Sequence, residues 1–245
     1  MPIDDLVTFD PKIPKEKPYL TKILIFFICL IFIAEVLFNA LYSDKGLIIL
    51  GAKWNSGITN GEYWRFITCT FLHGNIMHLF VNIAAIYIFG QEVESIYGAS
   101  KFILLYLISS WGASLTSYAF SPGIAIGASG AVFGVIGSLV IFFFRQRGKV
   151  TGAEMKFKSM YTLVIINLIF GFLLPRIDNF AHIGGLITGL LFSYFISPEY
   201  LIEKNETLNQ LVVVKKTNNK RTLLGLALII SLLTWLTKLA TILNK

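Results

Sequence analysis

Seven long apolar stretches, separated by polar segments, dominate the pattern along the chain. They cover residues 20–42, 79–97, 102–120, 127–144, 157–174, 180–196 and 222–243. A helix of roughly 20 apolar residues crosses the ~30 Å hydrocarbon core of a bilayer. The pattern therefore predicts an all-α polytopic membrane protein with seven transmembrane helices in one compact domain. The fifth and sixth stretches have only about 17 or 18 apolar positions each, so a re-entrant segment is an alternative for either of them.

The segments that flank and connect these helices differ in character. Residues 1–19 form a polar arm with four prolines and no small-residue cleavage site after it, so we expect residues 20–42 to be an anchor helix and not a signal peptide. Residues 197–221 are polar and rich in lysine, which indicates a cytosolic linker to an added final helix, 222–243. Residues 43–77 are too long for a plain connector and too apolar for a solvated loop. We expect them to form a partly helical insert in the outer interface, where aromatic rings are favoured: Trp54, Tyr63, Trp64, Phe66 and Phe71.

Composition and charge support a membrane location. The chain is 55% hydrophobic and 14% charged, whereas soluble domains are about 25% charged. The net charge of +7 arises from Lys and Arg residues that sit mostly in short loops between the apolar stretches. The positive-inside bias explains this distribution better than nucleic-acid binding does, and it places the N-terminus and residues 197–221 in the cytosol.

The sequence has no motif for a cofactor, metal or nucleotide. Cys29 and Cys69 are the only cysteines and make neither a disulfide framework nor a metal site. Phosphate-binding glycine loops and the H-E-x-x-H zinc motif do not occur. We therefore expect any chemistry to be carried out by side chains alone.

Polar side chains within the apolar stretches gather at one membrane face. His78 and Asn82 lie at the start of the second stretch, Ser129 at the start of the fourth and His182 at the start of the sixth. Even-numbered helices enter the membrane from the same side, and the charge distribution makes that the outer side. Because polar groups in a membrane are costly, this shared placement indicates a functional site.

Ser129 and His182 have the properties of a catalytic pair. Ser129 stands in a G-A-S-G sequence, residues 127–130, at a predicted helix start, where free N–H groups and the helix dipole favour negative charge. A hydrogen-bonded imidazole can take the proton of a serine hydroxyl. Each of the two residues belongs to a helix with a stripe of glycines along one face. The stripes are Gly127, Gly130, Gly134 and Gly137 on the helix of Ser129, and Gly185 and Gly189 on the helix of His182. If the two stripes pack against each other, Ser129 and His182 are brought together. Tight helix packing alone also explains these glycines.

Four other polar residues have weaker signals. His78 and Asn82 are four residues apart, so their side chains lie on one face of a helix. Both can donate a hydrogen bond to an oxyanion at the same point. Considered singly, either residue more often forms hydrogen bonds that hold two membrane helices together. Asp178 lies one turn before His182, and we expect it to be a helix cap and not the third member of a triad. His73 is expected to support the outer segment or the floor of the site.

In combination and order these motifs resemble the rhomboid proteases over roughly residues 20–196: Trp64-Arg65, His78-x-x-x-Asn82, G-A-Ser129-G, and Ala181-His182-x-x-Gly185-x-x-x-Gly189. The resemblance implies a six-helix catalytic core with a Ser129–His182 dyad. It also implies that His78, Asn82 and the Ser129 backbone N–H surround the oxyanion. Residues 222–243 match the six-plus-one arrangement of part of the family.

The resemblance further implies residues that support the site: Trp64, Arg65, Glu94, Gly127, Gly130, Phe133, Gly185 and Gly189. Phe133 stands where this family often has tyrosine, so it can stack on the histidine but lacks the hydroxyl. The short fifth stretch is the family's candidate for a substrate gate.

The sequence thus predicts an intramembrane serine endopeptidase that cleaves transmembrane segments of membrane proteins near the outer leaflet. Its expected partners are such substrates and the lipid bilayer, with neither nucleic acid nor nucleotide, and a bacterial cytoplasmic membrane is the expected location. The alternative is a non-proteolytic chaperone or quality-control protein that binds unstable transmembrane helices. A transporter is disfavoured because no internal repeat is evident.

Overall fold

The computed structural model describes residues 16–42, 45–174, 177–205 and 210–244. Most of the predicted polar arm, residues 1–15, lies outside this range. Within the described residues, seven helices are long and apolar enough to span a membrane. They are α1 (Leu20–Tyr42), α5 continued by η4 and α6 (Ile76–Tyr97), α7 (Ala99–Phe120), α8 (Ser129–Gln146), α9 (Ala153–Leu173), α10 (Asn179–Ile196) and α11 (Asn219–Leu243). The prediction of an all-α polytopic membrane protein is confirmed, and the fifth and sixth stretches are continuous helices.

The second spanning helix is interrupted near its middle. The α-helical segments α5 (Ile76–Ala85) and α6 (Gln91–Tyr97) are joined by η4 (Ile86–Gly90), a π-helical segment. The helix also begins at Ile76, three residues earlier than the apolar pattern indicated, because the side chain of Asn75 caps it by accepting a hydrogen bond from the backbone N–H of His78 at 2.9 Å.

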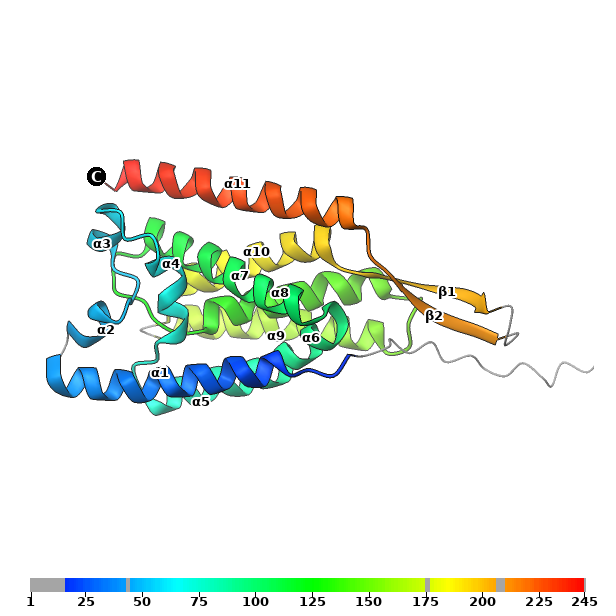
Figure 1. The fold of residues 1–245 in the computed structure, drawn as a ribbon, viewed down its shortest axis with the longest axis horizontal. Helices are drawn as coiled ribbons and strands as arrows, with labels where there is room; N and C mark the ends of the chain where they lie inside the picture. The colour runs from blue at the N-terminus through cyan, green and yellow to red at the C-terminus, as the bar shows by residue number, and fades with distance from the viewer. Residues whose placement is uncertain (1–15, 43–44, 175–176, 206–209, 245) are drawn as a thin grey trace, which may run out of the picture.

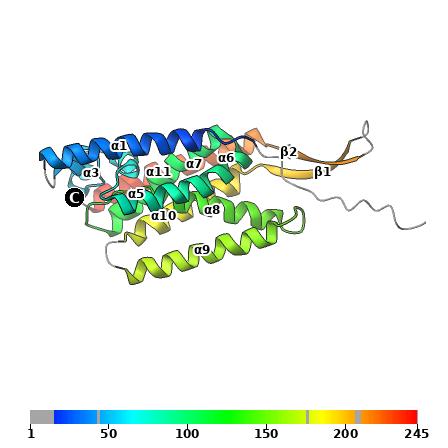
Figure 2. The ribbon, with the colours of Figure 1, turned by 90° about the horizontal axis from the view of Figure 1, so that it is seen from below.

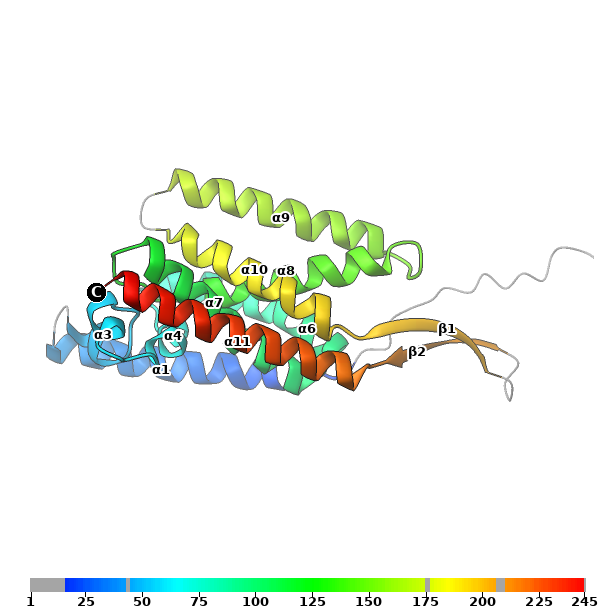
Figure 3. The same cartoon turned by 90° about the horizontal axis from the view of Figure 1, so that it is seen from above.

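The helices are arranged around α7, α8 and α10, which pack on one another, while α1 and α11 lie along opposite edges (Figure 1). Turning the molecule shows α9 at the periphery beside α8 and α10 (Figure 2 and Figure 3). In the most apolar part of each helix, 72% of α8 residues are buried inside the protein but only 11% of α9 residues. Most of α9 is therefore free to face lipid.

Close packing of α8 on α10 depends on glycines. A Cβ atom added to Gly185 would lie 1.9 Å from the carbonyl oxygen of Gly130, and one added to Gly189 would lie 1.9 Å from that of Gly134. Real Cβ atoms do not approach this closely, so only glycine permits the contact. The two glycine stripes of the sequence meet here.

The segment between the first two spanning helices is partly helical. It contains α2 (Gly46–Ile49), α3 (Asn55–Thr59), α4 (Arg65–Thr68) and the 3-10 turn η3 (Cys69–Phe71), while residues 43–44 lie outside the described range. Tyr63 and Trp64 are exposed, and Phe66 packs inward. This segment and the start of α11 are at opposite ends of the bundle (Figure 1).

The predicted linker 197–221 contains structure that the sequence pattern did not indicate. The antiparallel strands β1 (Glu199–Asn205) and β2 (Gln210–Lys216) pair with each other and project beyond the helices (Figure 1), while residues 206–209 lie outside the described range. The β-branched run Val212–Val214 favours a strand, but the surrounding lysines hide that signal in a hydropathy reading. Tyr200 anchors the hairpin, because its hydroxyl donates to the carbonyl of Ile96 at 3.1 Å.

Candidate active site

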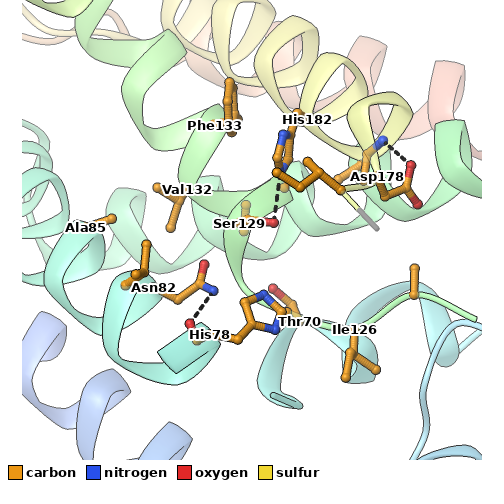
Figure 4. Close-up of a pocket in the computed structure, with 18 of the residues that line it drawn as sticks. Thr70, His78, Asn82, Ala85, Ile126, Ser129, Val132, Phe133, Asp178 and His182 are labelled. Carbon is orange, nitrogen blue, oxygen red and sulfur yellow. Dashed lines mark hydrogen bonds between the residues drawn. The ribbon is translucent and has the colours of Figure 1, made fainter. Parts of the chain in front are cut away.

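Ser129 is the first residue of α8, and its side chain lies beside His182 in the first turn of α10. The distance from Ser129 Oγ to His182 Nε2 is 3.0 Å, which is a hydrogen-bonding distance (Figure 4). The pair sits at the end of the glycine contact, where Gly130 lets the backbone of α10 approach α8. The close helix packing therefore sets the distance between the two side chains.

The imidazole of His182 is held mainly by ring packing. Its ring stacks on that of Phe133, with centroids 4.2 Å apart and an angle of 13° between the planes. His182 Nδ1 is buried and has no hydrogen-bond partner among the described residues. For Nε2 to accept the proton of the serine hydroxyl, the neutral ring must carry its hydrogen on Nδ1.

Asp178 caps α10 and does not contact the imidazole through a hydrogen bond. One carboxylate oxygen accepts the backbone N–H of Ala181 at 3.1 Å (Figure 4), and the other accepts the hydroxyl of Ser117 on α7. Both oxygens are thus engaged away from His182 Nδ1. This arrangement favours a dyad.

His78 and Asn82 approach the same place from α5. The side-chain amide of Asn82 donates to the carbonyl of His78 at 2.8 Å, which uses one of its two hydrogens and leaves the other for a ligand (Figure 4). The His78 ring packs so tightly on Gly127 that an added Cβ there would lie 2.5 Å from His78 Cε1. Gly127 also has φ of +115°, a conformation that favours glycine.

A cavity of about 770 Å³ contains these side chains. It lies between α5, α7 and the first turns of α8 and α10, and α9 contributes Leu163 to it. Most of its wall is apolar, including Val81, Ile88, Ile126 and Leu163. Ser129, His182, His78 and Asn82 are all in its lining. The cavity is therefore an apolar space with a small group of convergent polar atoms, as is typical of substrate sites.

Two of the residues expected to support the site, Trp64 and Arg65, lie outside the cavity lining and make their contacts in the outer segment. The guanidinium of Arg65 donates to Glu62 Oε2 at 2.5 Å, to the carbonyl of Ile48 at 2.7 Å and to that of Ala52 at 3.0 Å, and so holds the outer segment together. Trp64 is 54% exposed, as expected of a ring at a membrane interface.

Glu94 connects the far end of the second spanning helix to the start of α1. Its carboxylate accepts the backbone N–H groups of Tyr19, Leu20 and Thr21 at 2.9, 2.7 and 2.7 Å, and the hydroxyl of Thr21 at 2.6 Å. The first N–H groups of a helix lack partners within the helix. Glu94 thus caps α1 from another helix.

His73 lies under the site, in the bend between η3 and α5. Its Nε2 accepts the backbone N–H of Ala128, the residue before Ser129, at 3.4 Å. Burial lowers the pKa of His73 to about 4, and the neighbouring His78 adds to the effect. The ring is therefore neutral at pH 7, and its unprotonated Nε2 can accept this bond.

Lys53 is a residue at this site that the sequence reasoning missed. It is fully buried, and its Nζ donates to the carbonyls of Ser121 and Gly123 at 2.7 and 2.8 Å. Its backbone pairs in both directions with Ala125, at 2.9 and 3.1 Å. Lys53 thus holds residues 121–125, which lead into the Gly127–Ser129 turn. Nothing in the local sequence distinguishes it from an ordinary loop lysine.

Glu35 on α1 was also missed, although a signal existed, since it is the only acidic residue in the first apolar stretch. Its Oε2 accepts the backbone N–H of His73 at 2.7 Å. Within the described ranges no group of three His, Cys, Asp or Glu side chains lies close enough together to hold a metal ion.

Comparison with known proteins identifies the family. A model of the rhomboid domain matches residues 60–199. The rhomboid protease GluP of Bacillus subtilis (strain 168) is 38% identical over 177 residues, which are 71% of this chain and 34% of that protein. RHOMBOID-like protein 1 of Arabidopsis thaliana is 39% identical over 145 residues, 57% of this chain and 36% of that protein. RHOMBOID-like protein 6, mitochondrial, of the same plant is 38% identical over 156 residues, 63% of this chain and 50% of that protein.

The chain spans between about a third and a half of the length of these relatives. The match to the family model nevertheless covers more than half of the 245 residues and includes every residue of the candidate site except Glu35 and Lys53. The protein is an integral multi-pass membrane protein and belongs to the rhomboid family.

Proposed function

We propose that the protein is an intramembrane serine endopeptidase, with Ser129 as nucleophile and His182 as general base. The observation that carries this proposal is the 3.0 Å distance between Ser129 Oγ and His182 Nε2 within a cavity lined mostly by apolar side chains. A serine hydroxyl is a weak nucleophile at neutral pH, and an imidazole at this distance can accept its proton as it attacks a carbonyl.

In the proposed reaction Ser129 Oγ attacks the carbonyl carbon of a peptide bond while His182 Nε2 takes the hydroxyl proton. The negative charge that develops on the carbonyl oxygen is stabilised by the Ser129 backbone N–H, by the free hydrogen of the Asn82 amide and by His78. His182 then gives its proton to the leaving amine, which leaves an acyl-enzyme. A water molecule activated by His182 releases the acyl group and restores Ser129.

The substrate is proposed to be a transmembrane segment of another membrane protein, which enters from the lipid. Both α5 and α9 contribute side chains to the cavity, and α9 is the least buried of the spanning helices, so the proposed entrance lies between these two helices. A helical substrate has its carbonyl carbons shielded by its own backbone and side chains, so it must unwind before attack. Segments with helix-breaking residues should therefore be cleaved faster than polyleucine segments.

The site is proposed to lie in the outer leaflet, with the N-terminus in the cytosol of a bacterial cell. Support comes from the distribution of basic residues: Arg145, Arg147, Lys156 and Arg221 gather at the end of the bundle near the hairpin, away from Ser129. A cysteine-accessibility assay on intact cells, with one cysteine placed at Gly123 and another at Lys220, tests this orientation.

Cleavage of a single-pass membrane substrate in liposomes tests the catalytic proposal. The wild type, Ser129→Ala and His182→Ala are compared, with products identified by mass spectrometry. We expect cleavage by the wild type alone, at a bond near the outer end of the substrate helix. Cleavage by Ser129→Ala at the wild-type rate would contradict the assignment of the nucleophile.

The apolar cavity also supports a second candidate function, in which the protein binds unstable transmembrane helices without cutting them. Three results together would favour this function over proteolysis. The wild type would bind the same substrate, it would release no product from any substrate with helix-breaking residues, and Ser129→Ala would keep full function in cells.

A further inference from the structure

Glu35 is an ionisable side chain placed within α1, a membrane-spanning helix most of whose side chains are exposed or half-buried. Only four residues of α1 are buried, namely Thr21, Leu24, Ile28 and Glu35, and they lie along one side of the helix. Glu35 is 1% exposed. Because a carboxyl group in this position is costly, a contact that requires it is expected.

That contact is with the backbone below the candidate active site. Glu35 Oε2 accepts the N–H of His73 at 2.7 Å. His73 lies in the bend between η3 and α5, where this N–H has no carbonyl partner from a helix. The carboxyl group thus fixes the bend to α1.

The bend is in turn tied to the residues that precede the nucleophile. The His73 ring is fully buried, and its Nε2 accepts the N–H of Ala128 at 3.4 Å. The carbonyl of Cys69 accepts the N–H of Gly127 at 2.9 Å. Two hydrogen bonds from residues 69–73 therefore hold the turn that leads into Ser129.

The same ring also contacts the other side of the proposed oxyanion site. The centroids of His73 and His78 are 5.1 Å apart with an angle of 63° between the planes, an edge-to-face packing. A shift of His73 would thus be transmitted to both Ala128 and His78.

We propose that Glu35 is a positioning residue for peptide-bond cleavage: by holding the backbone of His73, it sets the position of the Gly127–Ser129 turn and of the His78 ring. The inference rests on the proposed function. Glu35 acts only as a hydrogen-bond acceptor in this role, so an amide oxygen can replace its carboxylate.

Substitutions at Glu35 separate this role from a general effect on α1. Glu35→Met matches the length of the side chain but cannot accept the His73 N–H, whereas Glu35→Gln can. We expect Glu35→Met to lower kcat about tenfold with KM changed less than twofold, because small misplacements of reacting groups are costly. Glu35→Gln should stay within about threefold of the wild type. Asn39→Leu, one turn further along α1, is the matched control and should have wild-type kcat.

A double-mutant cycle shows whether Glu35 acts through His73. His73→Leu retains the backbone N–H that Glu35 binds but removes the ring that Ala128 binds, so it should lower kcat by a similar factor. Glu35→Met should then cause no further loss in the His73→Leu background. Losses that multiply would overturn the inference, as would wild-type kcat in Glu35→Met. Glu35→Ala serves the same cycle if Glu35→Met does not fold.

Hydrogen exchange of the amides at residues 127–133 gives a readout that does not need activity. Exchange should be faster than in the wild type for Glu35→Met and His73→Leu, and unchanged for Glu35→Gln and Asn39→Leu. If the wild type cleaves no substrate, the proposed protease function is contradicted. The exchange rates would still show whether Glu35 positions the Gly127–Ser129 turn. Equal exchange in all variants would exclude this positioning role.

Discussion

The ring of Phe133 lies nearly parallel to the imidazole of His182, with centroids 4.2 Å apart. The two residues come from α8 and α10, so the stack crosses the same helix contact that brings Ser129 to His182. Because His182 Nδ1 has no hydrogen-bond partner among the described residues, ring packing is the main contact that orients the imidazole. In the proposed dyad, the orienting role that a carboxylate has in a triad is taken by an aromatic side chain.

Replacement of Phe133 should therefore affect catalysis more than stability. Aromatic pairs contribute about 1 kcal/mol beyond their buried area. Phe133→Leu should lower kcat about fivefold to tenfold, since a loss of that size is roughly this factor in rate. Phe133→Tyr keeps the ring and should retain wild-type kcat. Steady-state cleavage of one substrate by the three proteins measures this, and equal rates for Leu and Tyr would exclude an orienting role for the ring.

The glycine contact between α8 and α10 should not tolerate a single methyl group. An added Cβ at Gly185 or Gly189 would lie 1.9 Å from a backbone carbonyl oxygen of α8, and backbone atoms on both sides cannot move out of the way. We expect Gly185→Ala and Gly189→Ala to lose about 3 kcal/mol or more of unfolding free energy, at the upper end of the usual cost of overpacking.

Gly123 provides the matched control for these variants. No atom lies within 4 Å of a Cβ added there, so Gly123→Ala should unfold at the wild-type temperature. Thermal unfolding in detergent compares the three variants with the wild type. Unchanged melting of Gly185→Ala would mean that the two helices do not make this contact in the membrane.

The sequence alone was sufficient to predict the seven spanning helices and the gathering of Ser129, His182, His78 and Asn82. The reason is that polar side chains are rare in apolar stretches, and the alternating direction of consecutive helices puts the ends of even-numbered ones on one side.

Contacts between distant backbone and side-chain groups could not be predicted in the same way. Lys53 binds carbonyls about 70 residues away, and no local pattern encodes such a partner. Glu35 carried a signal, but its partner is a backbone N–H that any residue could supply. The hairpin β1–β2 was missed because lysines lower the hydropathy of a segment that contains a short β-branched run.

Glu94 should be important for stability because it caps α1 from another helix. Its carboxylate accepts four hydrogen bonds from Tyr19, Leu20 and Thr21. Hydrogen bonds to a charged group contribute more than neutral ones, and at this partly buried helix start the N–H and hydroxyl of Thr21 would be left buried without a partner. Glu94→Ala should lower the unfolding free energy by about 3 kcal/mol.

Glu154→Gln is a suitable control for Glu94→Ala. Glu154 is exposed and forms ion pairs with Lys158 at 3.2 Å and with Arg147 at 3.8 Å, which are surface contacts. Loss of such pairs changes stability by less than about 1 kcal/mol. Denaturant titrations measure the unfolding free energy of both variants. Equal values for Glu94→Ala and Glu154→Gln would mean that Glu94 does not cap α1.

Lys53 should make the stability of the protein depend on pH in the alkaline range. Burial lowers the pKa of Lys53 from 10.5 to about 8, against an opposing effect of the negative charge of Asp178. Below pH 8 the lysine is protonated in both the folded and the unfolded states, and the cost of burying its charge is fully present. Between pH 8 and 10.5 the unfolded state binds more protons at Lys53 than the folded state does, so the contribution of this residue to the unfolding free energy rises with pH.

Lys53→Met removes this titration and also leaves the carbonyls of Ser121 and Gly123 without their donor. The variant should therefore be less stable than the wild type at pH 8, by about 2 kcal/mol, and the difference should widen as the pH is raised to 10. The exposed Lys220→Met is the control for loss of a lysine charge at the surface. Melting temperatures of the three proteins between pH 7.5 and 10 test this, and a pH-independent difference for Lys53→Met would mean that the lysine remains charged while holding residues 121–125.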